Sequence, residues 1–168
     1  GILSAVNHID RPERDRLLAQ FAEKFAGDPL VMDKYFALTA SSRRADTPQQ
    51  IQAALQHPAF NLQNPNKARA LLGTFGRNVP HFHAADGRGY RFLADKILEA
   101  DRFNPSLAAR LVHAFNICRR LELVRRNLMA EQLRRLNGTE GLSGETGDIV
   151  GKILPAVCKR SLRRKPSL

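Results

Sequence analysis

Two histidines separated by one residue, His81 and His83, have the type and spacing that come closest to a metal-binding pair. A zinc site needs three or four ligands, together with hydrogen-bonded groups that support them. Asp86 is the acidic residue near enough in sequence to join the pair, and no Cys, Asp or Glu cluster completes a ligand set. We therefore expect no metal site here, and we expect His83 to fix its loop through a hydrogen bond to the backbone.

Nucleophilic catalysis has equally little support. No serine lies in a Gly-x-Ser-x-Gly turn, and Cys118 falls on the apolar side of a predicted helix. The nearest histidine, His113, is five residues away, a separation that does not place two side chains well on one helix face. No Gly-Lys-Ser/Thr sequence follows any of the glycines, which excludes a phosphate-binding loop. We expect no catalytic centre and no cofactor within this chain.

Arginine is the residue type left for a binding role. Arg69 and Arg110 each follow an Asn-Pro pair, in which Asn caps a helix and Pro occupies its first position. Both arginines are predicted on the polar side of their helices. A guanidinium can hold a peptide carboxylate or carbonyl oxygen with two hydrogen bonds. On the residues alone, the simpler interpretation is a surface arginine paired with a nearby acid.

The segments that position these residues have the apolar spacing of helices, bounded by Asn, Ser, Thr, Pro and Gly signals. No segment alternates apolar and polar residues, so the predicted fold class is all-α. Eight helices are predicted: Pro12 to Ala26, Pro29 to the polar residues Ser41–Arg44, Thr47 to His57, Pro65 to Gly76, Tyr90 to Ala100, Pro105 to Cys118, Leu123 to Leu136, and Ser143 to Leu154. Three of their ends have specific signals. Gly27 is expected to close the first helix in a left-handed conformation, Thr47 to begin the third with a capping box, and Pro155 to stop the last.

The starts of alternate helices recur at about 35 to 39 residues, the range of helical-hairpin repeats. Residues 1–154 are therefore predicted to form stacked antiparallel helix pairs, an irregular ARM/HEAT-like α-solenoid; an irregular bundle is the alternative. Residues 155–168 have low hydrophobicity and a run of positive charge, and they are predicted to be a disordered tail.

The formal net charge of +11 raises the attraction to nucleic acid and other anionic surfaces. However, five positive charges lie in the last ten residues, and the others are spread over helix faces as arginine pairs. Nucleic acid is therefore not the expected partner. No apolar run approaches the ~20 residues that cross a bilayer, and the first residues lack a signal-peptide pattern. These features predict a cytoplasmic location and no membrane partner.

Four strings stand out along the chain: VMDKYF (31–36), NPNKARALLG (64–73), FHAADGRGY (82–90) and FNPSLAARL (103–111). Together and in this order, they resemble the C-terminal helical domain of bacterial aminopeptidase N, a family of zinc-dependent peptidases. The resemblance covers about residues 28–154 and includes GLSGETGDIVGKIL (141–154) as the closing helix. Residues 155–168 depart from the family pattern.

This resemblance implies a domain that closes the active-site chamber of an enzyme removing N-terminal residues from peptides. In that family, arginines at the positions of Arg69 and Arg110 face the chamber near the C-terminal side of bound peptide, so both become predicted substrate-binding residues. Neither the H-E-x-x-H helix nor the Gly-Ala-Met-Glu-Asn strand of the family occurs here. Zinc is thus expected in a separate catalytic domain, and the expected partners are the catalytic and N-terminal domains and peptide substrates.

Two other classes remain open at this stage. One is a stand-alone α-solenoid that binds a peptide or protein without catalysis. The other is a basic nucleic-acid binder. An H-E-x-x-H sequence upstream in the full reading frame would separate the aminopeptidase interpretation from both.

Overall fold

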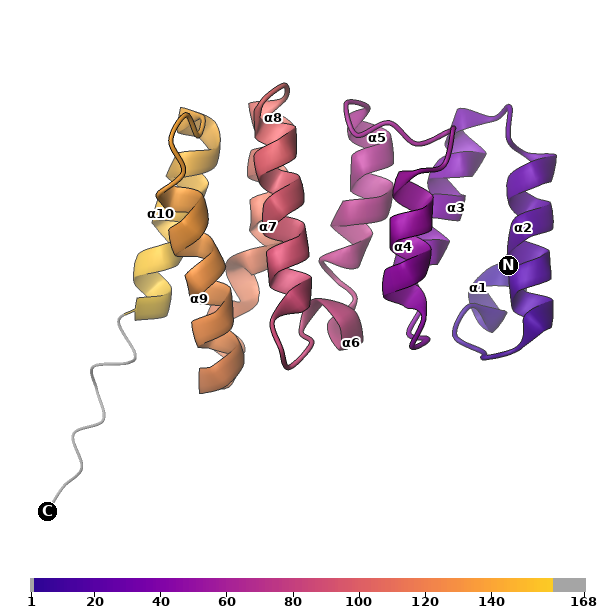
Figure 1. The fold of residues 1–168 in the computed structure, drawn as a ribbon, viewed down its shortest axis with the longest axis horizontal. Helices are drawn as coiled ribbons and strands as arrows, with labels where there is room; N and C mark the ends of the chain where they lie inside the picture. Colours follow the sequence, from indigo (N-terminus) through magenta and orange to yellow (C-terminus); the bar gives the residue numbers. More distant parts are fainter. Residues whose placement is uncertain (1, 159–168) are drawn as a thin grey trace, which may run out of the picture. The chain divides into compact units, whose positions relative to one another are not determined.

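The structure is a computed structural model that describes residues 2–158, in which all regular secondary structure is helical (Figure 1). The predicted all-α fold class is confirmed. The helices are α1 (Ile2–Val6), α2 (Pro12–Lys24), α3 (Pro29–Ser41), α4 (Thr47–Leu55), α5 (Pro65–Ala68), the π-helical η1 (Arg69–Gly73), α6 (Val79–Phe82), α7 (Arg88–Asp101), α8 (Pro105–Val112), the 3-10 helix η2 (His113–Arg120), α9 (Leu123–Asn137) and α10 (Gly144–Cys158).

All eight predicted helices are present, and two short ones, α1 and α6, were not predicted. The predicted helix from Pro65 to Gly76 is α5 continued by η1, and the one from Pro105 to Cys118 is α8 continued by η2. The helix that begins at Pro65 ends before Pro80, and Pro80 lies in the first turn of α6, where its missing N–H costs no helical hydrogen bond.

Three details of the predicted helix ends are wrong. Gly27 does not adopt a left-handed conformation, because α2 already ends at Lys24. Thr47 is not a capping residue: Asp46 holds the N-cap position, and the Thr47 hydroxyl donates to the carbonyl oxygen of Ser42 at 3.2 Å. Pro155 lies inside α10, which continues to Cys158; only one turn follows it, so little helix is distorted by the lost hydrogen bond. Residues 155–158, which are predicted to begin the disordered tail, belong to α10 instead, and the rest of the predicted tail lies outside the described residues.

The chain forms two compact units, residues 1–82 and 83–168. In the first unit, α3 packs against α2, α4 and the α5–η1 helix. Its core is apolar and includes Met32, Phe36, Ile51, Leu71 and Leu72, each at most 1% exposed. In the second unit, α7 packs against α8 and α9, and α10 packs against both α8 and α9 (Figure 1).

The second unit is tied together at the start of α10 by the carboxylate of Asp101, the last residue of α7. It accepts hydrogen bonds from the Ser143 hydroxyl at 2.5 Å, the Ser143 backbone N–H at 2.8 Å and the Thr146 hydroxyl at 2.5 Å. Ser143 also accepts from the backbone N–H of Thr146 at 3.3 Å, which confirms its predicted role as the cap of α10.

A burial pattern repeats between the two helices that begin with Asn-Pro. Asn64 and Asn104 are 40 residues apart, and buried residues recur at the same spacing. The buried pairs are Ala68 and Ala108, Leu71 and Leu111, Leu72 and Val112, and Phe75 and Phe115. A repeat of this length is typical of ARM and HEAT units.

Candidate functional site

The two Asn-Pro starts position the predicted binding arginines. The Asn64 side chain accepts hydrogen bonds from the backbone N–H groups of Asn66 at 2.9 Å and Lys67 at 3.4 Å. The Asn104 side chain accepts from the N–H of Leu107 at 3.0 Å. Both caps satisfy helix donors that would otherwise lack partners, so each arginine is carried on a helix with a fixed start.

Arg69 is exposed and lies at the first residue of η1. Its Nε donates to the carbonyl oxygen of Pro65 at 3.2 Å, and its Nη2 donates to the side-chain oxygen of Asn66. These bonds hold the side chain along the first turn of its own helix. The Nη1 group makes no hydrogen bond to any residue that the structure describes, and it remains available to an incoming oxygen acceptor.

Arg110 is exposed on α8, and no ion pair joins it to another residue between 3 and 155. It follows Asn104 by six residues, whereas Arg69 follows Asn64 by five. One residue turns an α-helix by about 100°, so the two arginines occupy neighbouring and not equivalent positions in their motifs. Among the residues that the structure describes, neither arginine has the acidic partner that the simple surface interpretation supposes.

The two histidines have different surroundings. His81 is 8% exposed, and its Nε2 has no hydrogen-bond partner among the described residues. His83 is half-buried, and its Nδ1 lies 2.8 Å from the hydroxyl of Tyr90. The Nε of Arg125 donates to the carbonyl oxygen of His83 at 2.7 Å. The His83 loop is therefore anchored as expected, but its ring bonds to a tyrosine hydroxyl.

The pKa shifts of His83 and Tyr90 both favour the uncharged forms of these side chains. Burial lowers the pKa of His83, and the positive charge of Arg125 lowers it further. Burial also raises the pKa of Tyr90 to about 12. A neutral imidazole and a neutral phenol share one hydrogen bond well, which suits a structural anchor. Arg125 could not be assigned to this cluster from local sequence patterns, because 42 residues separate it from His83.

The other chemical candidates stay apart. Cys118 is fully buried, and its thiol lies 3.8 Å from the carbonyl oxygen of Arg126. His113 is exposed and bonds through Nδ1 to the Asn116 side chain at 3.1 Å. Within residues 3–155, no group of three or more His, Cys, Asp and Glu side chains could hold a metal ion. None of the described helices is both long and apolar enough to cross a membrane.

Comparison with known proteins bears on this arrangement. Residues 1–155 match the family model described as "Domain of unknown function (DUF3458_C) ARM repeats". The chain belongs to this family. The ARM-repeat assignment agrees with the 40-residue repeat of caps and buried residues, and it confirms the predicted solenoid class.

Curated relatives of this ARM-repeat domain are aminopeptidases N. The chain is 41% identical over 142 residues to the Haemophilus influenzae protein, covering 84% of this chain and 16% of that one. It is 37% identical over 153 residues to the Escherichia coli protein, covering 90% and 18%. The predicted resemblance to the C-terminal domain of aminopeptidase N is thus confirmed. The chain spans less than a fifth of the length of these relatives.

A solved relative has the same fold. The crystal structure of Legionella pneumophila aminopeptidase A in complex with aspartic acid aligns with a TM-score of 0.85 and 30% identity. The alignment covers 91% of this chain and 18% of that protein. The ARM-repeat domain therefore resembles one part of a much larger aminopeptidase.

Proposed function

We propose that this chain is the C-terminal domain of a cytoplasmic, zinc-dependent aminopeptidase N-like enzyme, in which it closes the active-site chamber and limits peptide access. The observation that carries the proposal is the similarity to aminopeptidases N, at 37 to 41% identity over most of the chain. The described residues offer no group that could hold a metal ion. The zinc and the groups that activate water belong to the catalytic domain of the parent enzyme.

The contribution of this domain is to bind the part of the peptide remote from the bond that is cut. Arg69 and Arg110 are exposed, and their guanidinium groups have donors not taken up by acidic residues. They bind the C-terminal carboxylate or the distal carbonyl oxygens of a short peptide. Such remote binding energy can lower KM, or it can position the reacting amide and raise kcat.

The test uses the parent enzyme with Arg69→Ala and Arg110→Ala. Each substitution is expected to lower kcat/KM for di- and tripeptides by roughly 1 to 3 kcal/mol of transition-state stabilisation, as for a charged hydrogen bond. A single-residue anilide has no distal carboxylate, so its kcat/KM should hardly change. Arg16→Ala and Arg102→Ala also remove exposed arginines and serve as controls for the change in charge.

Three results would contradict the proposal. Equal losses for peptide and anilide would show that the arginines support the fold and not the peptide. No loss for either substrate would leave them as solvated surface residues. A full reading frame without H-E-x-x-H would remove the catalytic domain altogether and favour a stand-alone peptide-binding solenoid.

A further inference from the structure

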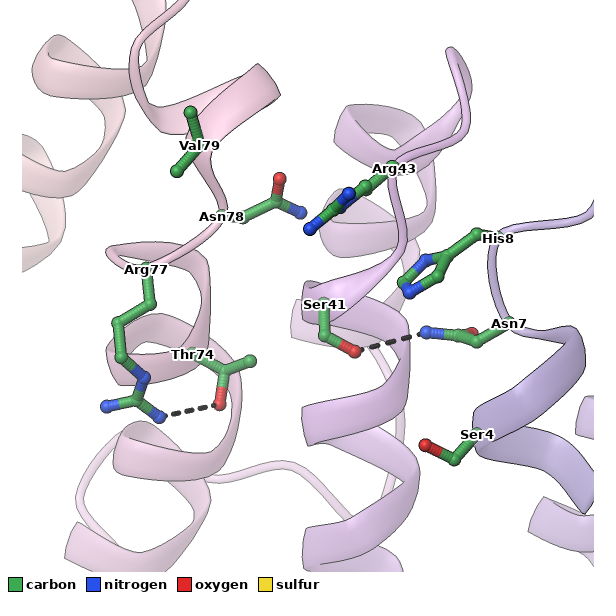
Figure 2. Close-up of a pocket in the computed structure, with 9 residues that line it drawn as sticks. All are labelled: Ser4, Asn7, His8, Ser41, Arg43, Thr74, Arg77, Asn78 and Val79. Carbon is green, nitrogen blue, oxygen red and sulfur yellow. Dashed lines mark hydrogen bonds between the residues drawn. The ribbon is translucent and has the colours of Figure 1, made fainter. Parts of the chain in front are cut away.

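A polar hollow of about 390 Å³ lies in the first unit, where α1, α3 and the α5–η1 helix all end. Figure 2 shows side chains from these three segments around it, among them His8, Arg43 and Arg77. Arg69 lies at the start of η1, whereas Thr74 and Arg77, which follow η1, line the hollow. The hollow is therefore at the opposite end of that helix from the proposed peptide-binding arginine.

The charged side chains that line this hollow are all basic. Two guanidinium groups and one imidazole line it, together with hydroxyl and amide groups, and no Asp or Glu is among its lining residues. Arg43 and His8 make no hydrogen bond or ion pair with any described residue. The side chain of Arg77 makes a long hydrogen bond, 3.4 Å from Nη2 to the Thr74 hydroxyl (Figure 2). Clustered cations without acidic partners attract an anion.

Basic residues at the C-terminal ends of helices often donate hydrogen bonds to the last carbonyl oxygens, which would be a simpler role for these arginines. In this unit, amide side chains already donate those hydrogen bonds. Asn78 Nδ2 donates to the carbonyl oxygens of Ala40 at 2.8 Å and Ser42 at 2.6 Å. Asn7 Nδ2 donates to the carbonyl oxygen of Leu38 at 2.8 Å. The carboxyl end of α3 is therefore capped without either arginine.

The wall of the hollow is also preformed. Asn7 is 3% exposed, and its side-chain oxygen accepts from Nη2 of the buried Arg14 at 2.8 Å. Its Nδ2 reaches the Ser41 hydroxyl at 3.1 Å, a bond drawn in Figure 2. The backbone oxygen of Asn7 accepts from the Ser42 hydroxyl at 3.1 Å. A ligand would meet a wall that needs little reorganisation, which lowers the cost of binding.

We propose that this hollow binds a small oxyanion ligand, a carboxylate or phosphate compound, between Arg43 and Arg77. Guanidinium groups suit both kinds of oxyanion because their N–H donors match paired oxygens. The hydroxyl group of Thr74 and the ring of His8 supply further polar contacts. The volume falls in the range of small-molecule pockets, about 300 to 1,000 Å³. This site is separate from the proposed peptide contacts of Arg69 and Arg110.

The test is isothermal titration of the 168-residue chain with inorganic phosphate and, separately, with succinate, at constant ionic strength. Saturable binding of either probe is expected. The Arg43→Gln/Arg77→Gln double variant should bind at least about tenfold more weakly, since it loses charged hydrogen bonds. The Arg16→Gln/Arg102→Gln control also removes two exposed positive charges, and its affinity should stay within about twofold.

The two probes identify the kind of ligand. Binding of phosphate alone assigns the site to phosphate compounds, binding of succinate alone assigns it to carboxylates, and binding of both supports a general oxyanion site. Circular dichroism of each variant checks that it is folded. Dissociation constants above about 10 mM for both probes would overturn the proposal. So would an equal loss of affinity in the control variant, because the attraction would then come from net charge and not from this hollow.

Discussion

The ammonium group of Lys67 lies 2.9 Å from the carboxylate of Asp33 and 2.7 Å from the carbonyl oxygen of Pro29. Lys67 is 6% exposed, and its ammonium also lies 5.7 Å from the ring centroid of Phe36. The α5 helix is thus joined to α3 by a buried charge whose main partner is one aspartate. Such a charge is stable in the protein interior only while it is paired.

Asp33→Ala should lower the free energy of unfolding by about 2 to 4 kcal/mol, because it leaves the Lys67 ammonium buried without its counter-charge. Lys67→Met removes the charge and keeps much of the apolar volume, so it should cost less. The double variant should be more stable than Asp33→Ala alone. Urea unfolding followed by circular dichroism measures all three, and an Asp33→Ala loss below about 1 kcal/mol would show that the pair is solvated.

Asp101 should give acid sensitivity. Its burial raises the pKa, but hydrogen bonds from Ser143 and Thr146 outweigh that effect and hold the pKa below its ordinary value. The lowered pKa contributes stability that is complete above about pH 4 and is lost as the pH falls through the folded-state pKa. Asp101→Asn should therefore cost about 1 to 3 kcal/mol at pH 7. Its deficit should shrink in unfolding experiments below pH 4, and a pH-independent deficit would contradict this account.

His83 should make the free energy of unfolding depend on pH at higher pH values than Asp101 does. Because its pKa is lowered in the folded state, the unfolded chain takes up a proton first, and stability falls as the pH drops below about 6.5. His83→Gln should flatten the stability profile between pH 7 and pH 5. The imidazole resonances followed by NMR should titrate below the ordinary histidine range. A His83→Gln variant that keeps the slope of the wild-type profile would contradict this account.

Gly87 is the N-cap residue of α7 and has a φ of 72°, and a Cβ added there would lie 3.2 Å from the Cβ of Leu128. Gly87→Ala should therefore suffer both backbone strain and overpacking, for a loss of about 2 to 4 kcal/mol. Gly141 has a similar φ of 78° and open space around it, so Gly141→Ala measures the backbone part alone. Equal losses in the two variants, measured by thermal unfolding, would show that Leu128 moves aside at no cost.

Most helices could be predicted because local chemistry fixes their starts. Asn64 and Asn104 each cap a helix directly before proline, and Ser143 caps α10. The errors lie at the ends of helices. The sequence predicts that Pro155 stops a helix, but Pro155 lies inside α10, which continues to Cys158. Thr47 is predicted to cap a helix, but its hydroxyl donates to the carbonyl oxygen of Ser42.

For the candidate sites, too, local sequence predicted some features, and packing between helices determined the others. The exposure of Arg69 and Arg110 could be predicted from helical spacing, because a polar residue between buried ones faces outward. The hollow around Arg43 and Arg77 could not be predicted. Its residues come from three segments, and only the packing of α1, α3 and the α5–η1 helix brings them together. No local pattern in the sequence predicts that these three segments lie close together.

The capping of α3 by distant amides has a consequence for how the first unit opens. The carbonyl oxygens of Leu38, Ala40 and Ser42 accept hydrogen bonds from the side chains of Asn7 and Asn78, which are 31 to 38 residues away along the chain. The hydroxyl groups of Ser41 and Thr47 add local bonds to Leu38 and Ser42. The last turn of α3 therefore loses these caps whenever either neighbouring segment detaches. In hydrogen exchange, we expect the backbone amides of that turn to become accessible together with those near Asn7 and Asn78, as one cooperative unit.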